Sequence, residues 1–133
     1  EEAAYGTLKA ALLISIHADY LPKNEGAAQG ASVYTLSDNA SDSEAARLAE
    51  SENRADVIAG VDLSGENSPV ASILIDLAQR DTMNRSVRFA ETVLTQLPPA
   101  TLVRPTSPHS SAGFAVLKGP DIPAVLIELG YLS

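Results

Sequence analysis

The chain alternates between short apolar runs and longer segments with helical periodicity. The runs at residues 11–16 (ALLISI) and 31–36 (ASVYTL) have the length of strands, and the first is apolar on both faces. Such a run is typical of a central strand in a parallel sheet. Two further strands are predicted near the end of the chain, at residues 114–118 (FAVLK) and 124–129 (AVLIEL), separated by the turn GPDIP.

A first helix is predicted after the second of these strands. It runs from about Asp42 to Asn53 in residues that form helices well. Ser41 and Glu44 have the spacing of a capping box at its start, in which each side chain satisfies a backbone N–H group of the first turn.

A second predicted helix begins at Pro69, with Ser68 as its N-cap, and an apolar stripe continues to about residue 97. The stripe consists of Val70, Ile73, Leu74, Leu77, Val87, Ala90, Val93, Leu94 and Leu97. The segment is either one long helix or two helices joined near RDTMN. Residues 98–113 are rich in Pro and Ser and are expected to hold little regular structure.

Strands that alternate with helices predict an α/β fold, with a mostly parallel central sheet flanked by helices. We expect a single domain over residues 1–133. No cap or turn precedes the first strand, and the chain stops abruptly at LIELGYLS. We therefore expect the chain to be a segment of something longer.

Composition narrows the classes of function. With 17 acidic and 9 basic residues, a formal net charge of −8 and no cluster of Lys or Arg, the chain is not suited to bind nucleic acid. It has no cysteine, so His, Asp and Glu are the available metal ligands. No apolar run approaches the roughly 20 residues of a membrane span. The first residues lack the basic start and apolar segment of a signal peptide.

Two ionisable residues stand where apolar strands end. His17 follows LLISI, and Glu128 ends AVLIE. Ligands of α/β sheets gather at the carboxyl ends of the strands, so these two side chains are candidates for one site. The residues alone leave another interpretation open, in which His17 is a hydrogen-bonded surface imidazole and Glu128 is solvated. His109, the other histidine, lies in the Pro/Ser segment and is expected to be exposed.

The stretches LLISIHAD, GASVYTLS and GFAVLKGPDIPAVLIELGYLS occur in combination. Together they resemble the family 3 catalytic domain of the zinc-dependent N-acetylmuramoyl-L-alanine amidases. The resemblance implies a peptidoglycan hydrolase that cleaves the amide bond between N-acetylmuramic acid and the L-alanine of the stem peptide. It also implies export to the periplasm or cell wall. In this family zinc is held by two histidines and a glutamate, and His17 matches the second histidine while Glu128 matches the catalytic glutamate.

Part of the family pattern has no counterpart in this chain, which implies that the chain lacks the N-terminal part of the fold. The first zinc histidine, in a D-x-G-H-G-G stretch, and the ligand glutamate are both missing. Because one histidine binds zinc weakly, we expect little or no amidase activity from these 133 residues alone. The alternative function is a non-catalytic cell-wall-binding or regulatory domain that has lost the zinc site. A D-x-G-H-G-G motif encoded upstream of Glu1 would favour the enzyme.

The resemblance also implies that residues 41–97 are a helical regulatory insert, similar to that of the amidases that act in cell division. In those enzymes a helix blocks the active site with a glutamate on zinc, until an activator with a LytM-type domain pulls the helix away. Glu44 is occupied by the capping box, and Glu52 shares an apolar stripe with Ala45, Leu48 and Ala49. Glu50 in ARLAESEN lies off that stripe and is the best match. As a fourth zinc ligand Glu50 would close the open coordination position. The alternative is that Glu50 belongs to a solvated acidic face.

Overall fold

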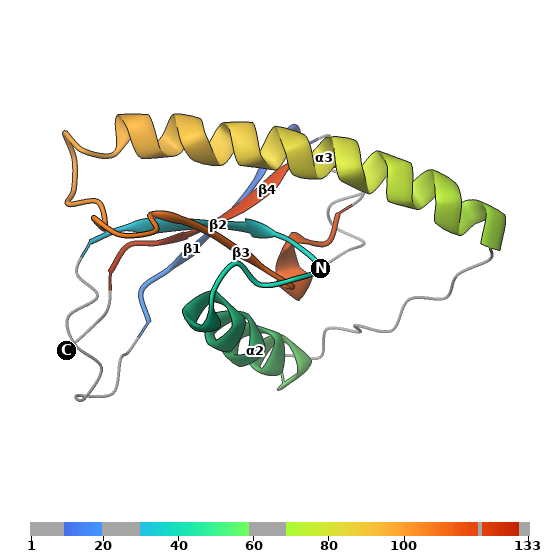
Figure 1. Ribbon diagram of the computed structural model, residues 1–133, viewed down its shortest axis with the longest axis horizontal. Coiled ribbons are helices and arrows are strands. Elements are labelled where there is room, and N and C mark those ends of the chain that lie inside the picture. The colour runs from blue at the N-terminus through green and yellow to red at the C-terminus, as the bar shows by residue number, and fades with distance from the viewer. Residues whose placement is uncertain (1–9, 20–29, 59–68, 120, 131–133) are drawn as a thin grey trace.

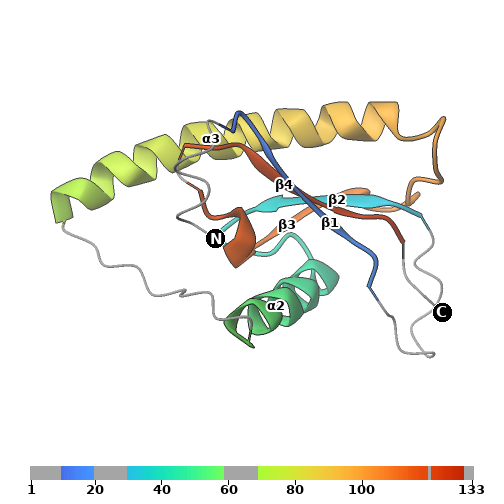
Figure 2. The same cartoon turned by 180° about the vertical axis from the view of Figure 1, so that it is seen from behind.

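The computed structural model describes residues 10–19, 30–58, 69–119 and 121–130. A sheet of four strands lies between two helices, α2 (Ser43–Ile58) and α3 (Pro69–Gln96), which cover opposite faces of it (Figure 1). The same layers are seen from behind in Figure 2. This is the α/β fold that the alternation of strands and helices predicts.

The sheet is mixed. Its strands, in spatial order, are β1 (Leu13–His17), β4 (Ala124–Glu128), β2 (Ser32–Leu36) and β3 (His109–Ala112). β1 pairs with β4 and β2 pairs with β3 in parallel, whereas β2 and β4 are antiparallel. Three of the four strands, β1, β2 and β4, lie in apolar runs that predict strands.

β1 is an outer strand of this sheet and not the central strand that its apolar run predicts. Its side chains alternate between the two faces, as in any strand. Ile14 and Ile16 are exposed, because α3 packs mainly against β2 and β4 on that face. Leu13 lies on the other face, where it packs against the core cluster beneath α2.

Each face of the sheet has its own apolar core. The cluster on the α2 side contains the buried residues Tyr34, Ala45, Ala49, Ala112, Phe114, Leu117, Ala124 and Leu126. The cluster on the α3 side contains Val33, Ala90 and Val125, with Phe89, Val93, Leu94, Leu97 and Ile127 packed against them. Successive residues of β4 alternate between the two clusters, which orients the strand and the residues at its end.

The N-cap of α2 is Asp42, so the capping box predicted from Ser41 and Glu44 is wrong. Asp42 Oδ1 accepts the N–H of Ala45 at 2.8 Å, and this bond is the main reason that the pKa of Asp42 is lowered. Glu44 instead accepts two hydrogen bonds from Arg104, at 2.7 and 2.6 Å. Because Asp42 and not Ser41 is the N-cap, the helix begins one residue later than the predicted capping box implies.

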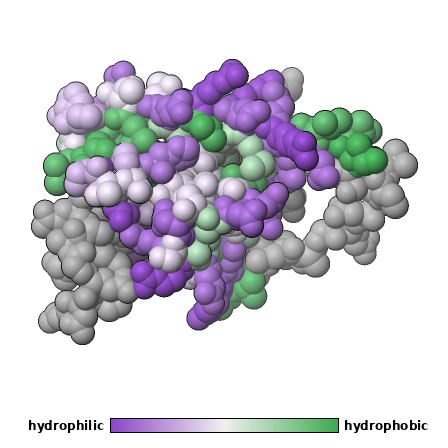
Figure 3. Space-filling model, viewed as in Figure 1, coloured by the Kyte–Doolittle hydropathy of each residue, from purple (hydrophilic) through white to green (hydrophobic). Residues whose placement is uncertain are grey.

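α3 is one continuous helix that begins at Pro69, as its sequence predicts, whereas Ser68 lies outside the described residues. The C-terminal half of the helix packs on the sheet through the α3-side cluster. Near the other end Ile73, Leu74 and Leu77 are exposed, so the apolar stripe is not buried along its whole length. Figure 3 shows the resulting apolar surface at that end of α3.

Two predictions fail between residues 98 and 118. The segment expected to be irregular contains β3, and the predicted strand 114–118 contains instead the 3-10 helix η1 (Ala115–Leu117). β3 needs only backbone groups to pair with β2, and the small side chains of Ser110 and Ala112 fit against the core. Phe114 is fully buried and packs its ring 5.5 Å from that of Tyr34.

Among the described residues, no helix combines the length and the apolarity that crossing a bilayer requires.

Candidate functional site

The two strand-end residues predicted to share a site are neighbours in the sheet. His17 of β1 and Glu128 of β4 are partners in the register of the parallel pair. The pairing continues one residue further, because Leu129 donates its N–H to the carbonyl of His17 at 2.9 Å. The candidate ligand and the candidate proton-transfer residue therefore start from adjacent backbone positions.

Glu128 is fully buried. Its Oε1 accepts the N–H groups of Asp19 at 3.2 Å and of Gly130 at 3.3 Å. Gly130 has a φ of 134°, a conformation that favours glycine, directly after the strand. Within the described residues Glu128 Oε2 and Asp19 Oδ2 are buried without a hydrogen-bond partner. The carboxyl group is thus oriented through one oxygen while the other stays available.

Burial raises the pKa of Glu128 to about 7, and the neighbouring carboxyl group of Asp19 adds to the effect. The two backbone N–H groups act in the opposite direction, because they stabilise the ionised form. A carboxyl group with a pKa near neutrality can both accept and deliver a proton at the pH of most cells. Such a shifted pKa at a strand end is typical of a catalytic acid or base.

The ring of His17 is held through both nitrogen atoms. Nε2 lies 2.8 Å from Ser15 Oγ, and Nδ1 lies 3.1 Å from Glu52 Oε2. Ser15 is two residues before His17 in β1, so both side chains project from the same face of the sheet. Glu52 extends from α2 toward that face. Side chains of both His17 and Glu52 are mostly buried, at 23% and 16% exposure. α2 therefore covers the imidazole.

His17, Asp19 and Glu52 form a cluster with the composition of a metal site. One ligand atom of each lies within 4.8 Å of the others. Burial raises the pKa of Glu52, and Asp19 and Asp56 add to the rise while His17 opposes it. A cation bound by this cluster would lie beside the carboxyl groups of Asp19 and Glu52 and would stabilise their ionised forms. Imidazole with carboxylates is a donor set that suits zinc.

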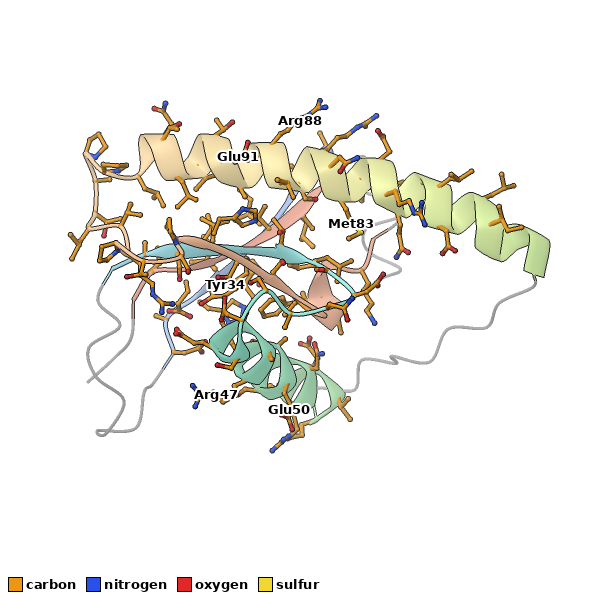
Figure 4. All side chains as sticks on the ribbon, viewed as in Figure 1. Tyr34, Arg47, Glu50, Met83, Arg88 and Glu91 are labelled. Atoms are coloured by element: carbon orange, nitrogen blue, oxygen red, sulfur yellow. The ribbon has the colours of Figure 1, made fainter. Side chains whose placement is uncertain are left out.

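The structure brings Glu52, and not Glu50, to His17. Glu50 is 69% exposed and accepts a hydrogen bond from Arg54 Nη2 at 2.6 Å, one helical turn further on. Figure 4 shows Glu50 and Arg47 on the side of α2 that faces away from the sheet. Side chains two residues apart in an α-helix are rotated by about 200° around the helix axis, so Glu50 and Glu52 point in nearly opposite directions. Glu50 therefore lies away from His17 in this structure, whereas Glu52 lies against it.

His109 is not the exposed loop residue that its surroundings predict. It begins β3, is partly buried, and its Nε2 lies 2.8 Å from Thr35 Oγ1. Burial lowers its pKa, and Glu91 of α3 opposes the shift. Since β3 and β1 are at opposite edges of the sheet, His109 does not join His17.

Sequence reasoning missed three residues of the site, namely Ser15, Asp19 and Glu52. Ser15 could have been found from the sequence, because side chains in a strand alternate between faces and Ser15 is two residues before His17. For Glu52 the signal was the apolar stripe that it shares with Ala45 and Ala49, both of which are buried against the sheet. A glutamate on the buried face of a helix points at whatever that face covers.

The chain has known relatives. The profile of the N-acetylmuramoyl-L-alanine amidase family (Amidase_3) matches residues 2–133. N-acetylmuramoyl-L-alanine amidase AmiC of Escherichia coli O6:H1 is 37% identical over 126 residues, which cover 94% of this chain and 29% of that protein. AmiA of Escherichia coli K12 is 35% identical over 123 residues, or 92% of this chain and 42% of the relative. AmiC of Neisseria meningitidis serogroup B is 35% identical over 126 residues, with coverages of 94% and 29%.

The chain belongs to this amidase family, because the family profile covers nearly all of it. It spans less than half the length of the relatives it matches.

Proposed function

We propose that this chain is part of the catalytic domain of a zinc-dependent peptidoglycan hydrolase. The enzyme would cleave the amide bond between N-acetylmuramic acid and the L-alanine of the stem peptide. Membership of the amidase family supports the reaction, and the matched relatives carry the name N-acetylmuramoyl-L-alanine amidase. The substrate lies outside the cytoplasmic membrane, so the protein would act in the periplasm or cell wall.

His17 is the residue that would contribute an imidazole to zinc. Its Nδ1 lies 3.1 Å from Glu52 Oε2, Asp19 belongs to the same cluster, and this mixed donor set fits the ion. Ser15 Oγ contacts the other ring nitrogen, which orients the ring as a second partner does for most metal-binding histidines. When bound, zinc would supply Lewis-acid chemistry by polarising the carbonyl group of the scissile amide.

Glu128 would move the proton in this reaction. Its pKa of about 7 lets it take a proton from the attacking water and then deliver one to the departing amine. Its Oε1 is held by two backbone N–H groups, so Oε2 is the atom available for that exchange. The register of β1 and β4 keeps this carboxyl group beside His17.

α2 would hold the enzyme in an inhibited state. Glu52 contacts His17 Nδ1, so with zinc on this nitrogen Glu52 would take a coordination position that water or substrate would otherwise fill. A carboxylate there can serve as a zinc ligand and fill an open coordination site. An activator, which we propose carries a LytM-type domain as in the amidases of cell division, would have to bind the open form of α2 more tightly than the closed form.

The contact between His17 Nδ1 and Glu52 Oε2 at 3.1 Å carries this proposal. The test compares Glu52→Gln with the matched control Glu50→Gln in the complete gene product. An amide is a poor zinc ligand, so Glu52→Gln should raise basal release of dye-labelled fragments from purified cell-wall sacculi. Glu50 is exposed on the far side of α2, so its substitution should leave the basal rate unchanged. Equal basal rates for wild type and Glu52→Gln would contradict inhibition by α2.

Zinc content is measured on the same samples. Stoichiometric zinc with hydrolysis supports the enzyme. A complete gene product that binds sacculi but contains no zinc and releases nothing would instead be the non-catalytic wall-binding or regulatory domain.

A further inference from the structure

The buried part of α2 is its first half. Ala45 and Ala49 pack into the core, whereas the residues of α2 after Ala49 are partly buried or exposed. Val57 and Ile58, at the end of the helix, are exposed. Apolar packing therefore does little to hold the second half of α2, which is the half that carries Glu52 to His17.

Polar contacts anchor the start of the helix. Asp42 caps it through Ala45, and its second carboxylate oxygen accepts a hydrogen bond from Ser110 of β3 at 2.9 Å. Glu44 is bound by both Nη atoms of Arg104. The first turn is thus connected to two separate segments of the protein body.

The second half is connected through Asn53. Its Nδ2 donates to the carbonyl of Gly113 at 2.8 Å, and its Oδ1 accepts the N–H of Ala115 at 2.7 Å. A side-chain amide donates from its nitrogen and accepts at its oxygen, so the single side chain of Asn53 makes both bonds. The backbone that receives them is held firmly, because Phe114 between the two partners is fully buried.

We propose that Asn53 is a latch that holds the second half of α2 against residues 113–115 and thereby keeps the adjacent Glu52 at His17. The inference deepens the regulation set out above and rests on the inhibitory role proposed for Glu52. Opening would break the two bonds of Asn53 while Asp42 and Glu44 stay bound. α2 would then swing or unwind from its C-terminal end, with its first half as the pivot.

The test is Asn53→Asp in the complete gene product. The substitution keeps the shape and the acceptor for Ala115, but it replaces the donor with a carboxylate oxygen that faces the carbonyl of Gly113. Amide hydrogen exchange of residues 52–58 should become about tenfold faster, as expected for the loss of one net hydrogen bond. Exchange of residues 45–49 should not change, and basal hydrolysis should rise. The matched control is Asn84→Asp, at an exposed position of α3, which should change neither.

Asn53→Ala removes both bonds without adding a charge and should make hydrogen exchange of the same residues faster. It provides a second test in case Asn53→Asp does not fold. Unchanged exchange of residues 52–58 in both variants would overturn the latch. Glu52→Gln, measured in parallel, separates this inference from the inhibitory role. If Glu52→Gln raises hydrolysis and the Asn53 variants do not, the latch is wrong and inhibition stands. If the Asn53 variants loosen the helix and no variant raises hydrolysis, the latch stands and inhibition is wrong.

Discussion

His17 and Glu128 are direct partners in the parallel pairing of β1 and β4. Both project toward α2, because Ala124 and Leu126, which share a face of β4 with Glu128, belong to the core cluster beneath that helix. The backbone of the sheet alone therefore brings the candidate metal ligand and the candidate proton-transfer group to one edge. Since the two side chains have different roles in the proposed reaction, substitutions should separate them.

Glu128→Gln should preserve the fold and the zinc content but lower amidase turnover by about 10²–10⁴-fold, the usual contribution of a general acid or base. The amide has nearly the same shape as the carboxyl group and can still accept the N–H groups of Asp19 and Gly130. It cannot take up the proton. Release of stem peptide from purified peptidoglycan measures turnover, and a near-normal rate would refute the role of Glu128.

His17→Ala should release zinc from the complete gene product, because removing one protein ligand leaves an under-coordinated cation. The other histidine of the chain provides the control. His109→Gln, at the opposite edge of the sheet, should keep the metal. Elemental analysis of both purified variants decides the question. Stoichiometric zinc in His17→Ala would show that His17 is not a ligand.

Glu128 should also make the stability of the metal-free protein depend on pH. Its pKa is about 7 in the fold and near 4.5 ordinarily, so the folded state holds the proton more tightly. The stabilisation is complete below about pH 4.5 and is lost as the pH rises through about 7, with a loss of up to about 3 kcal/mol. Denaturant unfolding with a chelator, near pH 5 and near pH 8, measures it. Glu128→Gln should remove this contribution, and an unchanged pH dependence would show that the group titrates normally.

Three of the four strands, β1, β2 and β4, could be predicted because each lies in a mainly apolar run with the length of a strand. β3 could not, since its sequence HSSA has no apolar run and pairs with β2 through backbone groups. η1 was mistaken for a strand because Phe114 and Leu117 are apolar, although they fill the core from a 3-10 turn. Local composition shows that a segment is buried, but it does not show in which conformation.

Part of the site could likewise be predicted from the sequence. Strand ends indicated that His17 and Glu128 lie at one edge, and the register confirms that they are adjacent. The sequence favours Glu50 because it lies off the apolar stripe, but in the structure Glu50 is exposed and paired with Arg54. Ala45 and Ala49 are buried against the sheet, and Glu52 lies on the same face of α2, so its side chain also points toward the sheet. The partners of Asn53 are about 60 residues away and have no signal in the sequence.

Removal of zinc should loosen the second half of α2. Burial raises the pKa of Glu52, and the nearby carboxyl groups of Asp19 and Asp56 raise it further, which means that they disfavour its ionised form. A divalent cation beside His17 would offset this repulsion and favour the closed helix, whereas without the cation the repulsion favours opening. Amide hydrogen exchange of residues 52–58, measured with zinc and after treatment with a chelator, should therefore be faster in the chelated protein. In Glu52→Gln the side chain at this position is uncharged and is not repelled by Asp19 and Asp56. Hydrogen exchange of residues 52–58 in this variant should therefore respond much less to the chelator. If wild-type exchange is the same with and without zinc, the metal does not hold α2 closed, and the contact between Glu52 and His17 is an ion pair that is independent of the metal.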